Sequence, residues 1–143
     1  MFLFDEVDFV QTQNLPLTGL WYFLPIGYLI TILIETPVLL LLLGPRFSLK
    51  QKLLAGVWLT ACTYPIVVIV LPAIFQGFDR WLYLTVAETF APVAECILFR
   101  LAFRGTEGVN WARAFAAIVI ANLASFGLGE VLNAYQWFGL LGS

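Results

Sequence analysis

Long hydrophobic runs dominate the chain, and polar residues gather in the short segments between them. Four runs come close to the ~20 residues that a helix needs to cross a bilayer. They predict spanning helices at Leu20–Leu43, Leu53–Phe75, Trp81–Phe103 and Ala112–Leu132. The links between them are rich in Gly, Pro and charged residues and leave no room for a soluble domain. The pattern predicts an all-α membrane protein, an antiparallel bundle of four transmembrane helices with short loops, in which residues 20–143 form one domain.

Composition supports a membrane protein and narrows the possible functions. Of the 143 residues, 62% are hydrophobic and 11% are charged, against about 25% charged residues in a soluble domain. The net charge of −2 argues against a nucleic-acid partner, which needs a basic surface. The chain has no histidine, so we expect no haem, no His-ligated metal and no catalytic triad that uses an imidazole.

Basic residues predict the orientation. They lie in or beside the first and third links, at Arg46, Lys50, Lys52, Arg100, Arg104 and Arg113. Only Arg80 lies near the opposite side. Because cytoplasmic loops carry the excess of Lys and Arg, we expect these links inside and both termini outside, in a multi-pass protein of a bacterial inner (plasma) membrane.

The segment before the first run, residues 1–19, has no basic residue and is predicted to lie outside. Within it, Met1 to Val10 mixes large apolar residues with three acids. Two interpretations remain open, namely an unstructured outer tail and a short helix lying in the membrane interface.

Four acids lie inside the predicted spans, where a charge costs roughly 2.5–3.5 kcal/mol. They are Glu35, Glu88, Glu95 and Glu130. A rise of about 1.5 Å per residue places Glu35 and Glu95 at similar depth, with Glu88 and then Glu130 further toward the outside. Glu88 and Glu95 are seven residues apart, which puts both on one face of the third helix. We therefore expect a ladder of carboxylates through the membrane.

Polar residues near mid-depth extend this candidate site. Tyr28 and Thr31 share a face with Glu35 in the first span, Thr60, Thr63 and Tyr64 cluster in the second, and Asn122 lies in the fourth. Pro37, Pro65 and Pro92 each free a backbone carbonyl one turn earlier. Carboxylates, carbonyls and hydroxyls suit a hard cation or a chain of proton-carrying waters. A divalent cation held by Glu35, Glu88 and Glu95 is one form of this hypothesis. The alternative is that each glutamate is a protonated carboxyl, hydrogen-bonded to a neighbouring helix.

Small residues recur every four positions along the fourth span, at Ala117, Ala121, Ser125 and Gly129. This pattern is typical of close helix packing, and it is also the best candidate interface for a homo-oligomer. Asn122, beside this face, is either an interhelical hydrogen-bonding group or a ligand. Cys62 and Cys96 are either small buried apolar residues or part of a soft-metal site.

Three functions from different classes follow. The first is a transporter- or channel-like protein with a glutamate-lined binding site or pathway for protons or a divalent cation. The second is a non-catalytic structural subunit of a larger membrane complex. The third is an intramembrane enzyme in which two neighbouring acids do general acid–base chemistry; it is the least favoured, because the sequence shows no nucleophile elbow and no phosphate-binding glycine loop. In size and helix count the chain resembles the small multidrug-resistance exporters, which also depend on a glutamate in their first helix. The resemblance covers architecture alone, so it assigns no residue.

Overall fold

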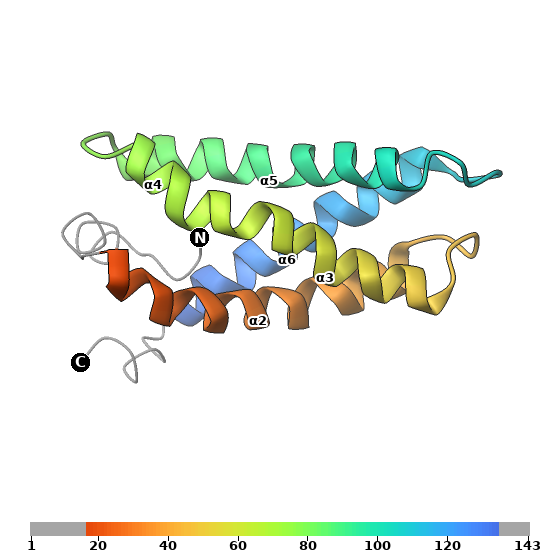
Figure 1. The fold of residues 1–143 in the computed structure, drawn as a ribbon, viewed down its shortest axis with the longest axis horizontal. Helices are drawn as coiled ribbons and strands as arrows, with labels where there is room; N and C mark the ends of the chain where they lie inside the picture. The colour runs from red at the N-terminus through yellow and green to blue at the C-terminus, as the bar shows by residue number, and fades with distance from the viewer. Residues whose placement is uncertain (1–16, 135–143) are drawn as a thin grey trace.

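The computed structural model describes the backbone of residues 17–134 and the side chains of residues 25–129 and 131. This part of the chain is all-helical (Figure 1). Its elements are α2 (Leu17–Leu42), α3 (Leu49–Pro65), η1 (Ile66–Val70), α4 (Leu71–Ile74), α5 (Arg80–Ala102) and α6 (Trp111–Ala134). The predictions for residues 1–16 lie outside the described residues.

Four helical stretches are long and apolar enough to cross a membrane, as the hydrophobic runs predict. The second span covers Leu49–Ile74 and joins α3, η1 and α4. It begins four residues before the predicted start at Leu53. The reason is a capping box, in which Ser48 Oγ accepts from Gln51 N at 3.2 Å and Gln51 Oε1 accepts from Ser48 N at 2.9 Å. These bonds start the helix in a polar turn that lies outside the hydrophobic run.

The middle of the second span is a π-helix, η1, between Pro65 and Pro72. There the N–H of Leu71 donates to Ile66 O, five residues back instead of four. Pro72 has no N–H to offer to Val67 O, the next carbonyl in this pattern. Tyr83 of α5 takes that place, because its hydroxyl donates to Val67 O at 3.0 Å. The wide turn is therefore held by a side chain from a neighbouring helix.

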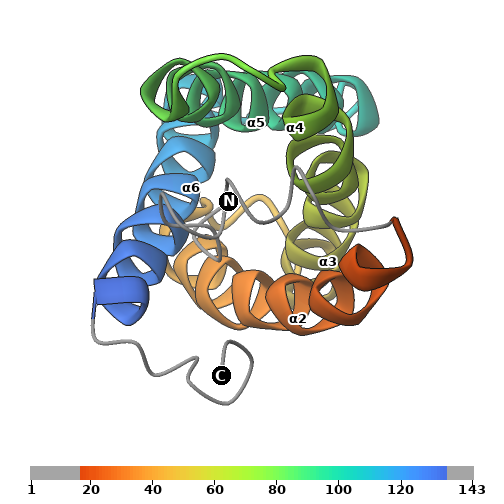
Figure 2. The same ribbon diagram turned by 90° about the vertical axis from the view of Figure 1, so that its left-hand side faces the viewer.

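The four spans form a ring in which each packs against two neighbours (Figure 2). α2 and α5 lie on opposite sides, and the second span and α6 connect them. Both connecting spans run obliquely: α3 begins beside α2 and α4 ends beside α5, while α6 begins beside α5 and ends beside α2 (Figures 1 and 2).

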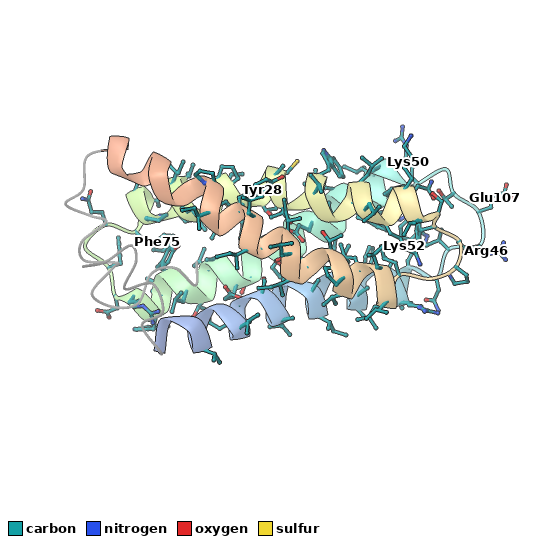
Figure 3. The ribbon with its side chains drawn as sticks, turned by 90° about the horizontal axis from the view of Figure 1, so that it is seen from below. Tyr28, Arg46, Lys50, Lys52, Phe75 and Glu107 are labelled. Carbon is teal, nitrogen blue, oxygen red and sulfur yellow. The ribbon has the colours of Figure 1, made fainter. Side chains whose placement is uncertain are left out.

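The two links at 43–48 and 103–110 lie at one end of the bundle, and the link between α4 and α5 lies at the other (Figure 1). We call the first the basic end, because it holds Arg46, Lys50, Lys52, Arg104 and Arg113; Figure 3 shows Arg46, Lys50 and Lys52 there, far from Phe75.

Two of these basic side chains also cap α2. Lys52 Nζ donates to Leu40 O at 3.4 Å and Arg113 Nε donates to Leu42 O at 2.9 Å. They satisfy carbonyls that a helix end leaves without partners, and their charge suits the negative end of the helix dipole.

Helix α2 approaches α3 most closely at Gly56. A Cβ atom placed on Gly56 would overlap Thr36 Oγ1 and lie 2.9 Å from Thr36 Cβ. Only a residue without a side chain allows this contact between the two helices, so Gly56 fixes their separation.

In contrast to a water-soluble protein, this bundle exposes large apolar side chains and buries several polar ones. Large apolar side chains face outward, including Leu33 at 72% and Leu41 at 79% exposure. The buried residues include eight polar ones, at Thr31, Glu35, Thr36, Thr60, Thr63, Glu95, Asn122 and Ser125. Such a surface is stable against lipid and not against water.

The buried apolar residues form two separate clusters. The Phe99 cluster, toward the basic end, contains Leu39, Leu43, Phe47, Ala55, Leu59, Phe99, Ala114, Ala117, Ile118 and Ala121. The Tyr83 cluster contains Val67, Leu71, Tyr83, Ala87 and Ala91. On α2 and α6, the buried polar residues follow or precede the residues of the Phe99 cluster along the helix. On the second span and α5, they lie between the residues of the two clusters. The protein therefore has a polar layer part-way through an apolar interior.

Candidate functional site

The polar layer contains a small cavity of about 30 Å³. All four spans line it, through Thr31, Glu35, Thr60, Thr63, Tyr64, Val67, Ala91, Glu95, Asn122 and Ser125. Glu35 from α2 and Glu95 from α5 are its two acidic residues, and they are 4% and 3% exposed. Two carboxyl groups from opposite sides of the ring thus face one small cavity.

Glu35 is held by hydroxyl groups from two other spans. Thr60 Oγ1 of α3 lies 2.9 Å from Glu35 Oε2, and Ser125 Oγ of α6 lies 2.7 Å from Glu35 Oε1. Both carboxyl oxygens therefore have a hydrogen-bond partner, as a buried polar group requires.

Glu95 is held in the same way by one hydroxyl and one amide. Thr63 Oγ1 of α3 lies 2.7 Å from Glu95 Oε1, and Asn122 Nδ2 of α6 donates to Glu95 Oε2 at 2.8 Å. The second proton of the Asn122 amide goes to Ile118 O at 3.0 Å. Asn122 is therefore fixed as a donor, while the Thr63 hydroxyl can either donate or accept.

Each of the three hydroxyls has two acceptors within reach but only one proton. Besides its glutamate, Thr60 lies 2.8 Å from Gly56 O, Thr63 lies 3.1 Å from Leu59 O and Ser125 lies 2.9 Å from Asn122 O. A hydroxyl can donate to an ionised carboxylate, or it can donate to the backbone and accept the proton of a neutral carboxyl. The site can therefore satisfy either protonation state by rotating hydroxyl groups.

Tyr64 also lines the cavity and is 6% exposed. Its ring packs on that of Tyr28, with 6.0 Å between ring centroids, and Tyr28 is anchored by donating to Val57 O at 3.0 Å. Figure 3 shows Tyr28 part-way between Phe75 and the basic end. Within the described part of the chain the Tyr64 hydroxyl has no hydrogen-bond partner. A cavity of about 30 Å³ has room for about two or three water molecules, each of which needs roughly 10–15 Å³ and two to four polar partners.

The predicted ladder of four glutamates is only partly present. Glu35 and Glu95 come together, as their similar depth implies, and Thr63, Tyr64 and Asn122 join them. Glu88 is half-buried and is not among the residues that line the cavity; both it and Arg80 interact electrostatically with Tyr83. The side chain of Glu130 lies outside the described residues.

Three further hydroxyl residues line the cavity: Thr31 and Thr60 belong to the hydroxyl groups that the sequence places near mid-depth, whereas Ser125 is not predicted to be part of the site. Thr60 and Ser125 contact Glu35, and Thr31 lines the cavity while donating to its own helix at Gly27 O, 2.9 Å away. The small-residue pattern predicts only a packing role for Ser125. Its position three residues after Asn122, on the same face of α6, could have indicated that it belongs to the site.

The small-residue face of α6 lies inside the bundle. Ala117, Ala121, Ser125 and Gly129 are all buried within this single chain. They serve helix packing between neighbouring spans, as the pattern predicts, and this face is therefore not available as an interface for another subunit.

The three glutamates Glu35, Glu88 and Glu95 do not form a metal site in this structure. The described residues contain no group of three His, Cys, Asp or Glu side chains arranged to hold a metal ion. This finding covers Cys62 and Cys96 as well, which are both free thiols. The cavity holds two carboxyl groups, Glu35 and Glu95, which is a smaller set of ligands than a divalent metal ion requires.

Comparison with known protein families, with characterised proteins and with solved structures finds no match for this chain. The resemblance to the small multidrug-resistance exporters therefore goes no further than size and helix count.

Proposed function

We propose that the protein is an antiparallel four-helix membrane protein, with both termini on the non-cytoplasmic side, that binds and transfers protons through Glu35 and Glu95. The observation that carries the proposal is that these two buried carboxyls face one small cavity, each held by side chains of two other spans. Two negative charges around so small a space repel strongly in a medium of low dielectric constant. The pair is therefore expected to keep at least one proton.

Two features favour a proton over a divalent cation. Ca²⁺ takes six to eight oxygen ligands and Mg²⁺ usually keeps several waters, whereas this cavity of about 30 Å³ has room for only about two or three waters at roughly 10–15 Å³ each. The hydroxyls of Thr60, Thr63 and Ser125 can also serve both the charged and the neutral carboxyl without moving their oxygens. That property suits a site that repeatedly gains and loses a proton.

The distribution of basic side chains supports the orientation. Six of the seven Lys and Arg residues lie at or close to the basic end, which the positive-inside tendency assigns to the cytoplasm. The Phe99 cluster then lies between the cavity and the cytoplasm, and α4 lies toward the outside. Transfer of a proton to the cytoplasm would require a transient opening in that cluster.

Proton flux into liposomes tests the proposal. The purified chain is reconstituted, a pH gradient is imposed, and an enclosed pH-sensitive dye reports its decay. We expect the wild-type protein to dissipate the gradient faster than empty liposomes. The double variant Glu35→Gln/Glu95→Gln should lose this activity, because a glutamine cannot release a proton.

Glutamine can keep the hydrogen bonds of a neutral carboxyl, so the double variant is expected to fold. The matched control is Glu107→Gln, which removes an exposed carboxylate in the link between α5 and α6 (Figure 3). A double variant that dissipates the gradient as fast as wild type would refute the role of the pair. Wild-type flux equal to that of empty liposomes would refute proton transfer by this chain alone.

A further inference from the structure

A second feature, separate from the glutamate cavity, lies between α5 and α6 on the surface of the bundle that faces away from its interior. It is a groove of about 430 Å³. Its apolar lining includes Pro92, Val93, Cys96 and Ile97 of α5, and Phe115 and Val119 of α6. From Thr89 to Leu101 the lining follows α5 for roughly 18 Å, at about 1.5 Å per residue. A volume of this size is typical of a site for a small molecule.

The polar atoms along the groove are satisfied within the chain. Thr89 Oγ1 donates to Thr85 O at 2.8 Å, and Cys96 Sγ lies 4.0 Å from Phe115 O. An occupant of this part of the groove therefore finds hydrocarbon surface and no free donor. A flexible apolar chain suits such a lining better than a polar ligand.

Arg100 is the exception, and it lies among the last residues of the groove on α5, near the basic end. Its guanidinium stacks on the ring of Trp111 of α6, 4.1 Å from the ring centroid. Among the residues that the structure describes, no carboxylate forms an ion pair with Arg100. Stacking fixes the plane of the guanidinium and leaves its N–H groups for an anion, and this fork matches the oxygens of a phosphate group.

We propose that this groove binds one anionic phospholipid, with an acyl chain along α5 and the phosphate group on Arg100. The occupant must be amphipathic, because the lining is apolar over most of its length and cationic at one end. A headgroup with a net negative charge is favoured over a zwitterionic one, because the cationic amine of a zwitterionic headgroup lies beside its phosphate group and is repelled by Arg100. A transmembrane helix of a second copy would need an acidic side chain opposite Arg100 to fill this groove. A phospholipid carries its own negative group, the phosphate.

Lipid titration followed by native mass spectrometry tests the proposal with the full chain in a mild detergent. The probes are phosphatidylglycerol and phosphatidylcholine with identical acyl chains. We expect wild type to bind one phosphatidylglycerol about tenfold more tightly than phosphatidylcholine, since a repulsion of about 1.4 kcal/mol between Arg100 and the choline group corresponds to a factor of ten. Arg100→Gln should bind the two lipids with equal affinity. The matched control, Arg104→Gln, removes an exposed arginine of the adjoining link and should keep the preference.

A second variant tests the apolar part of the groove. Val119→Phe adds volume to the lining and should weaken binding of both lipids while the preference for phosphatidylglycerol remains. The proposal is overturned if Arg100→Gln keeps the tenfold preference, or if Arg104→Gln loses it equally, which indicates diffuse charge attraction. It is also overturned if Ile97→Cys forms a disulfide-linked dimer that binds neither lipid, because a second copy then fills the groove. Neither readout depends on proton flux.

Discussion

Replacing Thr60 with valine isolates the interaction between a hydroxyl and a buried carboxyl. Thr60 is fully buried, and its Oγ1 lies 2.9 Å from Glu35 Oε2. Valine has nearly the same shape, so the change removes the hydroxyl without opening a large cavity. It leaves Glu35 Oε2 facing a methyl group, without the hydrogen-bond partner that Thr60 supplies.

The expected loss follows from the cost of an unsatisfied buried acceptor, about 1–3 kcal/mol, and from hydrogen bonds between helices in membranes, which average about 0.6 and reach about 1.7 kcal/mol. We therefore expect Thr60→Val to lower the free energy of unfolding by about 1–2 kcal/mol. This corresponds to a factor of about 5–30 in the folded-to-unfolded ratio. The measurement is reversible unfolding in mixed micelles, followed by circular dichroism or tryptophan fluorescence.

The matched control is Thr89→Val on α5. Thr89 makes the same bond to its own helix, with Oγ1 2.8 Å from Thr85 O, but it is exposed and contacts no carboxyl. Its replacement should change the unfolding free energy by less than about 0.5 kcal/mol, as is usual for surface substitutions. If Thr60→Val costs no more than Thr89→Val, the hydroxyl does not support Glu35 and the reasoning about the site is wrong.

Three further substitutions test the fold around the site by the same unfolding measurement. Gly56→Ala places a methyl group against Thr36 and should cost about 1–3 kcal/mol, typical of overpacking; an unchanged stability would mean that α2 and α3 can separate freely. Tyr83→Phe removes the donor to Val67 O in the π-helix and should cost about 1 kcal/mol, and no loss would show that η1 does not need this bond. Ser48→Ala breaks the capping box and should cost about 0.5–2 kcal/mol, whereas Ser48→Thr should retain most of the stability.

The number and approximate limits of the spans could be predicted from the sequence, because hydrophobic run length reports directly on the bilayer. The start of the second span could not be predicted from hydropathy, since Leu49–Lys52 is a polar turn. The Ser48-x-x-Gln51 signature does identify it. The π-helix was not predictable either. Pro65 and Pro72 indicate a disturbed helix, but whether it kinks or widens depends on Tyr83, which comes from another span.

The pairing of Glu35 with Glu95 followed from depth alone, because depth is set by position along each helix. The position of Glu88 needed the rotation of α5 about its axis. The buried residues of α5 recur every four positions, at Tyr83, Ala87, Ala91, Glu95 and Phe99. Glu88 is one residue away from this row, so it points about 100° away from Ala87. Glu88 still lies within about 20° of Glu95 around the helix, but the buried row turns by about 40° at each step of four residues. At the level of Glu88 the residue that faces the interior is therefore Ala87.

Infrared difference spectroscopy of the reconstituted protein tests the central claim most directly, because the C=O stretch of a neutral carboxyl is separate from the bands of a carboxylate. As the pH is raised, wild type should lose a neutral-carboxyl band that belongs to the pair. The band should be missing in Glu35→Gln/Glu95→Gln and unchanged in Glu107→Gln. A band that persists unchanged in the double variant, or a wild-type spectrum without any titrating buried carboxyl, would contradict proton binding by Glu35 and Glu95.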